Sequence, residues 1–361
     1  MLARTPEQWA EALGSWGEPR FRARQVFSWI HRQGVLDPGA MTTLPKGLRA
    51  RLARESLGLP FRVEARAPSA DGTQKLLVHL SEGGRIETVL IPQVHAGARG
   101  EVTQCVSSQV GCAMACVFCA SGRAGLMRNL RAEEIVGQVL AGRQHLTPGQ
   151  RLTNVVYMGM GEPLHNYEAV AASLRLLTHS EGIALSHRRV TVSTSGLVPQ
   201  IDRLARDFDG RVGLAVSLHA VDDERRSRIM PINRKHPLAE LMACLRRYPL
   251  PKRRRITIEY TLIRGFNDGL DDAERLVDLL EGIPAKVNLI PMNPIPGNPL
   301  EAPEAPAVDR FAARVRHRGV STFVRKQRGD DIAAACGQLA LHGVHRRVKV
   351  GPEDVVPPEG T

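Results

Sequence analysis

Four of the six cysteines lie within fifteen residues, and three of them have the spacing C-x3-C-x2-C at Cys112, Cys116 and Cys119. They offer three thiolate ligands on one short loop, with Cys105 as a candidate for a fourth. Structural zinc is usually held by four ligands, commonly in two separated pairs. A four-iron cluster bound by three cysteines instead leaves one iron open to a substrate or cofactor. The spacing therefore favours an iron–sulfur cluster, and zinc or loop cysteines without a metal are the alternatives.

The two remaining cysteines lie far along the chain from this loop. Cys244 falls in the helical context Leu-Met-Ala-Cys-Leu, and we expect it to pack in the core. Cys336 ends the stretch Asp330-Asp-Ile-Ala-Ala-Ala-Cys336, which predicts a helix capped at its start and broken at Gly337. Taken alone, a single cysteine is most often a small buried apolar residue.

Composition narrows the class of protein. The chain of 361 residues is 43% hydrophobic and 24% charged, which excludes a largely disordered or membrane-embedded chain. No apolar run approaches the roughly eighteen residues of a membrane-spanning helix. No secretory signal is visible after Met1, so we expect a cytoplasmic protein whose thiols stay reduced. The net charge of +12 favours a polyanionic partner such as nucleic acid, and a basic enzyme without such a partner is the alternative.

Strand patterns alternate with amphipathic helix patterns from about residue 103. Strands are predicted at 102–107, 153–158, 189–194, 212–218, 256–263 and 286–291. Helices are predicted at 131–142, 166–179, 197–207, 237–247 and 270–282. This alternation predicts an α/β fold with a parallel sheet, in which six units form a partial or complete (β/α)6 barrel. The site is then expected at the carboxyl ends of the strands.

The first hundred residues have a different pattern. All three tryptophans fall within the first thirty residues, and helix patterns cover 6–15, 20–34 and 45–57. Together they predict a small helical domain over 1–60 with its own core. Three strand-like runs then begin at Phe61, Lys75 and Arg85. Because Asp-Gly and Gly-Gly separate them, they predict a β-meander that extends the main domain over 61–100.

The rest of the chain is assigned to one main domain and a tail. The main domain covers 101–345, and the Pro-rich segment 291–306 interrupts its pattern. Residues 346–361 are expected to form a frayed C-terminal tail.

Several motifs resemble those of known enzymes. The cysteine spacing, with Phe118 before the last cysteine, resembles the signature of the radical S-adenosylmethionine superfamily. Further motifs resemble the RlmN family, at Ser107–Cys112, Met158–Leu164, Val192–Gly196, Ser217–His219, Met230–Asn233 and Arg328–Gln338. The resemblance covers about 85–345 and implies a partial radical S-adenosylmethionine barrel. That family methylates carbon 2 of adenine in RNA, both in 23S ribosomal RNA and at the adenosine 3′ of the anticodon in transfer RNA.

The resemblance implies two cofactors. Carbon 2 of adenine has no lone pair for attack on a methyl sulfonium, so a radical route is needed. In the family a [4Fe-4S] cluster on Cys112, Cys116 and Cys119 binds S-adenosylmethionine and cleaves it reductively to a 5′-deoxyadenosyl radical. The resemblance places S-adenosylmethionine contacts at Gly161, Glu162, Ser195, Ser217, Leu218, His219 and Asn293. Taken singly, Ser195 reads as a strand cap and His219 as a core histidine, and Ser193 competes with Ser195 for the same role.

The resemblance also assigns catalytic roles. The residue matching Cys336 accepts a methyl group from one S-adenosylmethionine, and the radical from a second molecule activates that S-methyl group for addition to adenine. Cys105 matches the cysteine that resolves the covalent enzyme–RNA adduct through a transient disulfide with Cys336. Glu87 matches the proton acceptor for carbon 2. A carboxylate on a strand is otherwise usually a solvated edge residue.

RNA partners are expected to meet basic surfaces. The candidates are the runs Lys252–Arg255 and His345–Lys349, with Arg20, Arg22 and Arg24 in an RNA-binding helical domain. Each run is otherwise an ordinary solvated face. Aromatic residues make up only 4%, so base-stacking platforms are not indicated. The resemblance further implies an electron donor such as flavodoxin or ferredoxin, a monomer, and no membrane partner.

Three other functions compete. The Cfr-like relatives use the same cysteines to methylate carbon 8 of a 23S ribosomal adenine. A glycyl-radical activating enzyme would need neither Cys105 nor Cys336. A non-catalytic RNA-binding protein with a structural metal site would need only the loop cysteines. The helical N-terminal region and the Arg325–Asp331 context before Cys336 favour the RlmN family.

Overall fold

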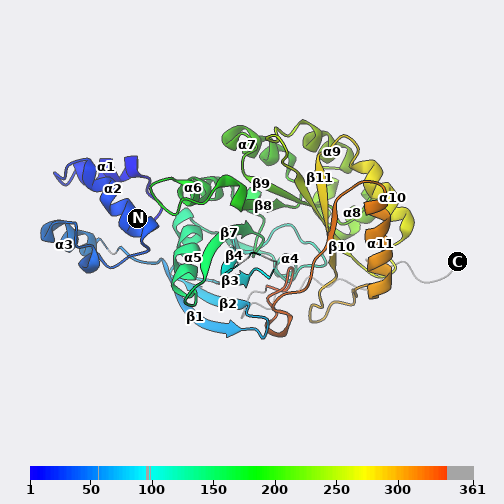
Figure 1. Cartoon of the computed structure of the whole chain (residues 1–361), viewed down its shortest axis with the longest axis horizontal. Coiled ribbons are helices and arrows are strands. Elements are labelled where there is room, and N and C mark those ends of the chain that lie inside the picture. Colours follow the sequence, from blue (N-terminus) through cyan, green and yellow to red (C-terminus); the bar gives the residue numbers. More distant parts are fainter. Residues whose placement is uncertain (56, 95–96, 98, 340–361) are drawn as a thin grey trace.

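A computed structural model describes residues 1–55, 57–94, 97 and 99–339 of the protein. Its main feature is one sheet of ten strands in the order β1-β2-β3-β4-β7-β8-β9-β10-β11-β12. The helices of the N-terminal segment lie at one end of the molecule, and most later helices flank the curved sheet (Figure 1).

The parallel part of the sheet follows the predicted alternation. Its strands are β4 (Glu101–Cys105), β7 (Arg151–Tyr157), β8 (Val190–Thr194), β9 (Gly213–Ser217), β10 (Ile256–Leu262), β11 (Ala285–Pro291) and β12 (Thr322–Val324). The first six overlap the predicted strands, and the short β12 adds a seventh parallel strand. In the described part of the chain no ladder joins β1 to β12, so the sheet is an open, partial barrel as expected.

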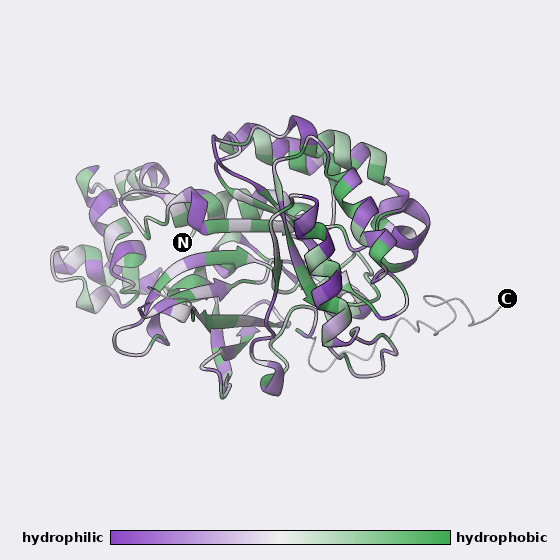
Figure 2. Ribbon diagram, turned by 45° about the vertical axis from the view of Figure 1, so that its right-hand side comes forward, coloured by the Kyte–Doolittle hydropathy of each residue, from purple (hydrophilic) through white to green (hydrophobic). Residues whose placement is uncertain are grey.

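Helices connect successive parallel strands. They are α4 (Ala120–Ala124), α5 (Ala132–Gln144), α6 (Tyr167–Thr178), α7 (Val198–Phe208), α8 (Asp223–Ile229), α9 (Leu238–Arg247), α10 (Leu270–Leu279) and α11 (Ala305–His317). A small ladder of β5 (Gln109–Gly111) and β6 (Leu126–Asn129) precedes α5. All five predicted helices are present, and α4, α8 and α11 are additional. Apolar residues concentrate where helices face the sheet (Figure 2).

The meander has the predicted form. Strands β1 (Phe61–Pro68), β2 (Gln74–Leu80) and β3 (Arg85–Pro92) pair antiparallel in sequence order, and β3 pairs antiparallel with β4. The meander therefore continues the barrel sheet past its first parallel strand. This places β3 beside the strand that leads to the cysteine loop.

The N-terminal helices are α1 (Pro6–Gly14), α2 (Phe21–Phe27) with a π-helical turn at Ser28–Arg32, and α3 (Lys46–Arg54). The expected N-terminal core is present as a cluster distinct from the barrel core, but it is not closed by these helices alone. The apolar cluster around Trp9 also includes Val136 and Leu140 of α5 and Leu176 of α6. Because a segment this short buries little surface alone, it completes its core against the barrel helices.

The predicted helix over Asp330–Cys336 is also wrong. The segment makes only a 3-10 turn at Asp330–Ile332, and Ala333 follows with a positive φ of 50°. The side chain of Asp331 accepts hydrogen bonds from Ser69 and Ala70 in the β1–β2 loop instead of capping a helix. Tertiary contacts thus replace the local hydrogen bonds that a helix requires. The basic run His345–Lys349 and the tail 346–361 lie outside the described residues.

Candidate active site

The three cysteines of the C-x3-C-x2-C motif lie on the loop between β5 and α4. A side chain at Gly122 would come within 2.9 Å of the backbone nitrogen of Cys116, so this tight loop requires glycine there. Burial raises the pKa of Cys112 to about 12 and also raises the pKa values of Cys116 and Cys119. Buried thiolates need a compensating positive charge, and an iron–sulfur cluster supplies it.

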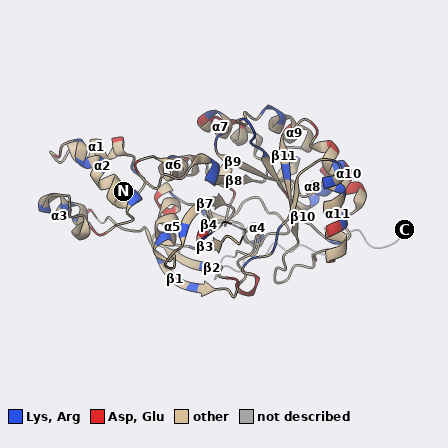
Figure 3. Ribbon diagram, viewed as in Figure 1, with Lys and Arg blue, Asp and Glu red and all other residues tan. Residues whose placement is uncertain are grey.

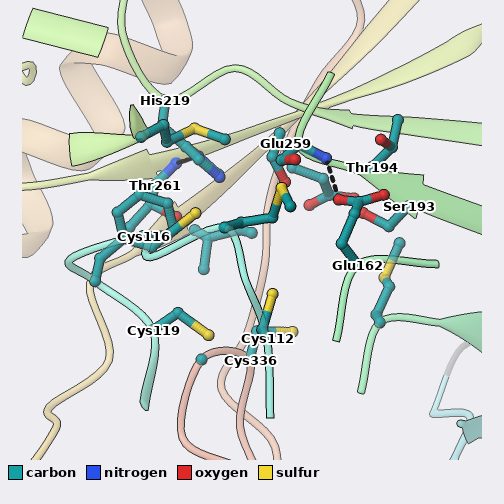
Figure 4. A pocket seen from close by; sticks show the side chains of 18 of the residues that line it. Cys112, Cys116, Cys119, Glu162, Ser193, Thr194, His219, Glu259, Thr261 and Cys336 are labelled. Atoms are coloured by element: carbon teal, nitrogen blue, oxygen red, sulfur yellow. Dashed lines mark hydrogen bonds between the residues drawn. The ribbon is translucent and has the colours of Figure 1, made fainter. Parts of the chain in front are cut away.

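These cysteines face one end of a cavity at the carboxyl ends of the barrel strands (Figure 4). Predicted site residues that line it are Cys112, Cys116, Cys119, Gly161, Glu162, Ser193, Ser195, Ser217, His219, Asn293 and Cys336. Both serines that competed for one role therefore reach the cavity. Leu218, Cys105 and Glu87 do not line it. In the described part of the chain, no three His, Cys, Asp or Glu side chains are arranged to hold a single metal ion.

Glu162 forms the other end of the cavity. Its carboxylate accepts hydrogen bonds from the backbone N–H groups of Ser195 at 2.8 Å and Leu164 at 3.0 Å. Burial raises the pKa of Glu162, so a cationic ligand would stabilise the charged form. The buried hydroxyl of Ser195 has no hydrogen-bond partner among the described residues. A buried carboxylate beside an unpaired hydroxyl fits the amino acid part of S-adenosylmethionine.

His219 is held in a fixed tautomer. Its Nδ1 accepts a hydrogen bond from the backbone N–H of Thr261 at 2.9 Å, so the neutral ring carries its proton on Nε2. Burial lowers the pKa of His219 to about 3, which keeps the ring neutral. Its φ of 59° is uncommon for a residue other than glycine, and Phe118 packs edge-on at 4.6 Å. The ring therefore offers a rigid donor to the cavity.

A buried arginine that the sequence analysis did not identify holds the strand ends. Arg226 of α8 is fully buried and donates to the carbonyls of Ser195 at 2.7 Å, Ser217 at 3.0 Å and Leu218 at 3.1 Å. Asn233, in the Met230–Asn233 motif, accepts a further hydrogen bond from Arg226 at 2.8 Å. Leu218 thus contributes its backbone to this network, while its side chain is buried away from the cavity. Asn233, the last residue of the Met230–Asn233 motif, thus helps to hold the Arg226 guanidinium in place.

Cys336 lies on a loop that three parts of the fold hold in place. The carbonyl of Gly337 accepts a hydrogen bond from the backbone N–H of Ala120, next to the cluster loop. Asn293 donates to the carbonyl of Cys336 at 2.8 Å and accepts from Gln327 at 2.6 Å. Asn293 therefore lines the cavity but uses its side chain to hold the Cys336 loop.

The meander holds the same loop from the other side. Lys75 donates to the carbonyl of Ala333 at 3.1 Å and forms an ion pair with Glu87 at 2.9 Å. Arg328 forms an ion pair with Asp71 at 3.3 Å. Glu87 is only 1% exposed, so the interpretation of a solvated edge carboxylate is wrong. It does not line the cavity and is linked to the Cys336 loop through Lys75.

Cys105 ends β4 and is buried. Burial raises the pKa of Cys105 to about 12, and the negative charge of a Cys336 thiolate acts in the same direction. Both cysteines are free thiols. Cys244 is buried in α9, where its sulfur contacts Asp202 at 3.4 Å, so the packing expectation is confirmed.

Arg325 and Glu259 are further residues of the site that the sequence analysis did not single out. Both line the cavity, and Arg325 lies 4.0 Å from the carboxylate of Glu259. The negative charge of a Cys336 thiolate raises the pKa of Arg325, and Glu259 and Cys105 act in the same direction. The Arg325 guanidinium in turn lowers the pKa of Cys105, against the larger effect of burial.

The charge of the molecule is spread over many elements. Lys and Arg occur on the N-terminal helices and on the barrel helices, with acidic residues interspersed (Figure 3). No helix in the described part of the chain is long and apolar enough to cross a membrane.

Two family models and several relatives match this chain. Residues 106–280 match the radical SAM superfamily, and residues 1–57 match the ribosomal RNA large subunit methyltransferase N-terminal domain. The chain is 58% identical to the dual-specificity RNA methyltransferase RlmN of Sorangium cellulosum, over 96% of this chain and 97% of that protein. It is 49% identical to the protein of that name from Acidiphilium cryptum, over 92% and 86% of the two chains.

A solved structure is also similar. The crystal structure of a radical SAM methyltransferase from Sphaerobacter thermophilus superposes with a TM-score of 0.88 and 48% identity, covering 94% of this chain and 98% of the other. These matches make the chain a radical RNA methyltransferase that uses a [4Fe-4S] cluster and S-adenosylmethionine. The glycyl-radical activating enzyme and the RNA-binding protein with a structural metal site are therefore wrong alternatives. With relatives matched over nearly their whole length, the chain belongs to the RlmN family.

Proposed function

We propose that this enzyme methylates carbon 2 of adenine in 23S ribosomal RNA and at the adenosine 3′ of the anticodon in transfer RNA, with Cys336 as methyl carrier. The observation that carries the proposal is the position of Cys336, which lines the cavity of the three cluster cysteines and is electrostatically coupled to Cys105. The names of the relatives, which describe dual-specificity RNA methyltransferases, support the choice of substrates.

The cavity residues bind and orient S-adenosylmethionine. Glu162 receives its ammonium group, and the free hydroxyl of Ser195 is available to its polar atoms. Nε2 of His219 donates a hydrogen bond from a fixed ring. When bound, the cluster and S-adenosylmethionine supply the radical that removes hydrogen from a methyl group.

Cys336 and Cys105 perform the sulfur chemistry. The Cys336 thiolate attacks the methyl carbon of the sulfonium, and S-adenosylhomocysteine leaves as a neutral thioether, while the proton of the thiol goes to solvent. After the activated methyl carbon has joined adenine, the adduct gives up the carbon 2 proton and one electron, which the oxidised cluster would accept. The Cys105 thiolate then attacks the sulfur of Cys336. The sulfur–carbon bond breaks with its electron pair going to the carbon, which takes up a proton to become the new methyl group, and a disulfide remains. Glu87, linked to the Cys336 loop by Lys75, is the acceptor of the carbon 2 proton.

The remaining parts of the proposal concern domains and partners. Residues 1–60 form the RNA-binding accessory domain, 61–100 the meander that supports Cys336, 101–345 the catalytic barrel and 346–361 a tail. Exposed Arg20 and Arg24 in the first of these suit RNA phosphates. A small acidic redox protein such as flavodoxin or ferredoxin delivers the electron to a monomeric, cytoplasmic enzyme.

Methyl loading of the protein tests the carrier role. The reconstituted enzyme is incubated anaerobically with S-adenosylmethionine and reductant, then digested, and the Cys336 peptide is weighed by mass spectrometry. We expect one added methyl group on Cys336 in the wild type and in Cys244→Ala, the matched control in the core. Cys336→Ala should lose RNA methylation and retain its iron–sulfur absorption. Undiminished RNA methylation by Cys336→Ala would overturn the carrier role.

A further inference from the structure

A second cavity, of about 310 Å³, lies on the other side of Cys336. It opens between the end of β3, the end of β11 and the segment that leads from β12 to Cys336. Cys336, Asn293 and Arg325 line both this cavity and the one that holds the cluster cysteines. Cys336 therefore stands in the wall between two compartments, of which the first contains the cluster cysteines and Glu162.

The walls of the second cavity suit a purine. Its apolar surface comes from the β3 end, the β11 end and the residues before Cys336, namely Ile91, Pro92, Ile290, Pro291, Ala334 and Ala335. Gln93 and Gln327 add amide groups that can donate and accept hydrogen bonds. An apolar slot with a few polar groups is the usual form of a small-ligand site.

The charged residues of this cavity are all cations. Arg325, Lys326 and Arg328 line it, and no carboxylate does so within the described residues. Arg325 faces Glu259 at 4.0 Å, and Arg328 pairs with Asp71 at 3.3 Å. Lys326 is exposed and has no ion pair in the described part of the chain. It is therefore available to an anionic group of a ligand.

We propose that the second cavity binds the target nucleotide of the RNA, with the adenine between the β3 and β11 ends and Lys326 on an adjacent phosphate. This inference rests on the proposed function. The carbon carried by the Cys336 sulfur must meet the adenine ring, so the ring must enter a compartment that Cys336 lines. In the proposed function the first compartment would hold S-adenosylmethionine, which leaves the second for a base flipped out of an RNA loop.

RNA binding to single variants tests the assignment. The reconstituted full-length enzyme is titrated with a fluorescently labelled anticodon stem-loop, at several salt concentrations, and anisotropy gives Kd. Lys326→Ala should weaken binding about three- to tenfold and lower the slope of log Kd against log salt by about one. Lys326→Arg should restore both. Arg310→Ala is the matched control, because Arg310 is an exposed cation on α11 that lines neither cavity and lies outside the basic runs expected to meet RNA.

The base contact is tested with RNA that lacks the target base. An abasic residue at that position should weaken binding to the wild type, and Lys326→Ala should weaken binding of both RNAs by the same factor. Unchanged affinity and salt slope in Lys326→Ala would overturn the assignment, and so would equal losses in Lys326→Ala and Arg310→Ala. A loss of Cys336 methyl loading in Lys326→Ala would instead place Lys326 with the first cavity. Failure of the wild type to load Cys336 with methyl would contradict the proposed function itself, independently of these affinities.

Discussion

Release of methylated RNA from the enzyme should accelerate steeply with pH. Resolution of the adduct requires the thiolate of Cys105, and burial raises the pKa of that thiol to about 12. In the adduct Cys336 is a thioether without charge, so burial is the main remaining cause of the raised pKa of Cys105. Because the pKa of Cys105 stays raised by burial, the thiolate is a small fraction of the thiol between pH 7 and pH 9, and that fraction grows about tenfold per pH unit. Between pH 7 and pH 9 the release rate should rise about a hundredfold.

Single-turnover kinetics measures this rate. The adduct between enzyme and RNA is formed anaerobically at pH 7, shifted to a series of pH values, and quenched in acid. Denaturing electrophoresis then separates adduct from free RNA. Cys105→Ala is expected to keep RNA bound at every pH, and Cys244→Ala to release it like the wild type.

Two results would refute the reasoning. A release rate independent of pH between 7 and 9 would show that ionisation of a buried thiol does not limit resolution. Release of RNA from Cys105→Ala at the wild-type rate would show that another group performs the step.

Three further perturbations follow from the contacts of the site. Arg226→Lys removes most of the hydrogen bonds to three buried carbonyls and should lower the free energy of unfolding by about 3–5 kcal/mol, measured by urea denaturation; an unchanged midpoint would contradict the anchoring role. Glu162→Gln keeps an acceptor for Ser195 but removes the charge, so affinity for S-adenosylmethionine should fall about tenfold or more in calorimetry, whereas equal affinity would exclude an ammonium contact. Asp331→Ala frees the Cys336 loop from Ser69 and Ala70, so alkylation of Cys336 should be faster than in the wild type, and an equal rate would show that this contact does not hold the loop.

The barrel could be predicted from the sequence because its strands are buried and its helices amphipathic. Strand β9 is a short apolar run, β8 alternates apolar and polar residues, and α7 and α9 have clear apolar faces. The three-residue β12 carries too little pattern to be recognised. Helix α11 follows a Pro-rich segment, so its first residue could not be recognised from the sequence.

The residues that line the cavity were predicted from motifs. The residues that hold them in place were not. Glu162 and the three loop cysteines stand in recognisable motifs, and the structure places them around one cavity. Arg226 was missed because an arginine in a polar helical stretch normally faces solvent, and only the tertiary structure shows its buried partners. The helix predicted before Cys336 failed for a related reason, since Asp331 bonds to a loop more than 200 residues away.

The most direct test of the central claim is the identity of the product. The reconstituted enzyme is supplied anaerobically with S-adenosylmethionine, a reductant and unmodified ribosomal or transfer RNA, and the digested nucleosides are identified by mass spectrometry against standards. The proposed function predicts 2-methyladenosine from both RNAs. Finding 8-methyladenosine confined to ribosomal RNA would contradict it and place the activity with the Cfr-like relatives.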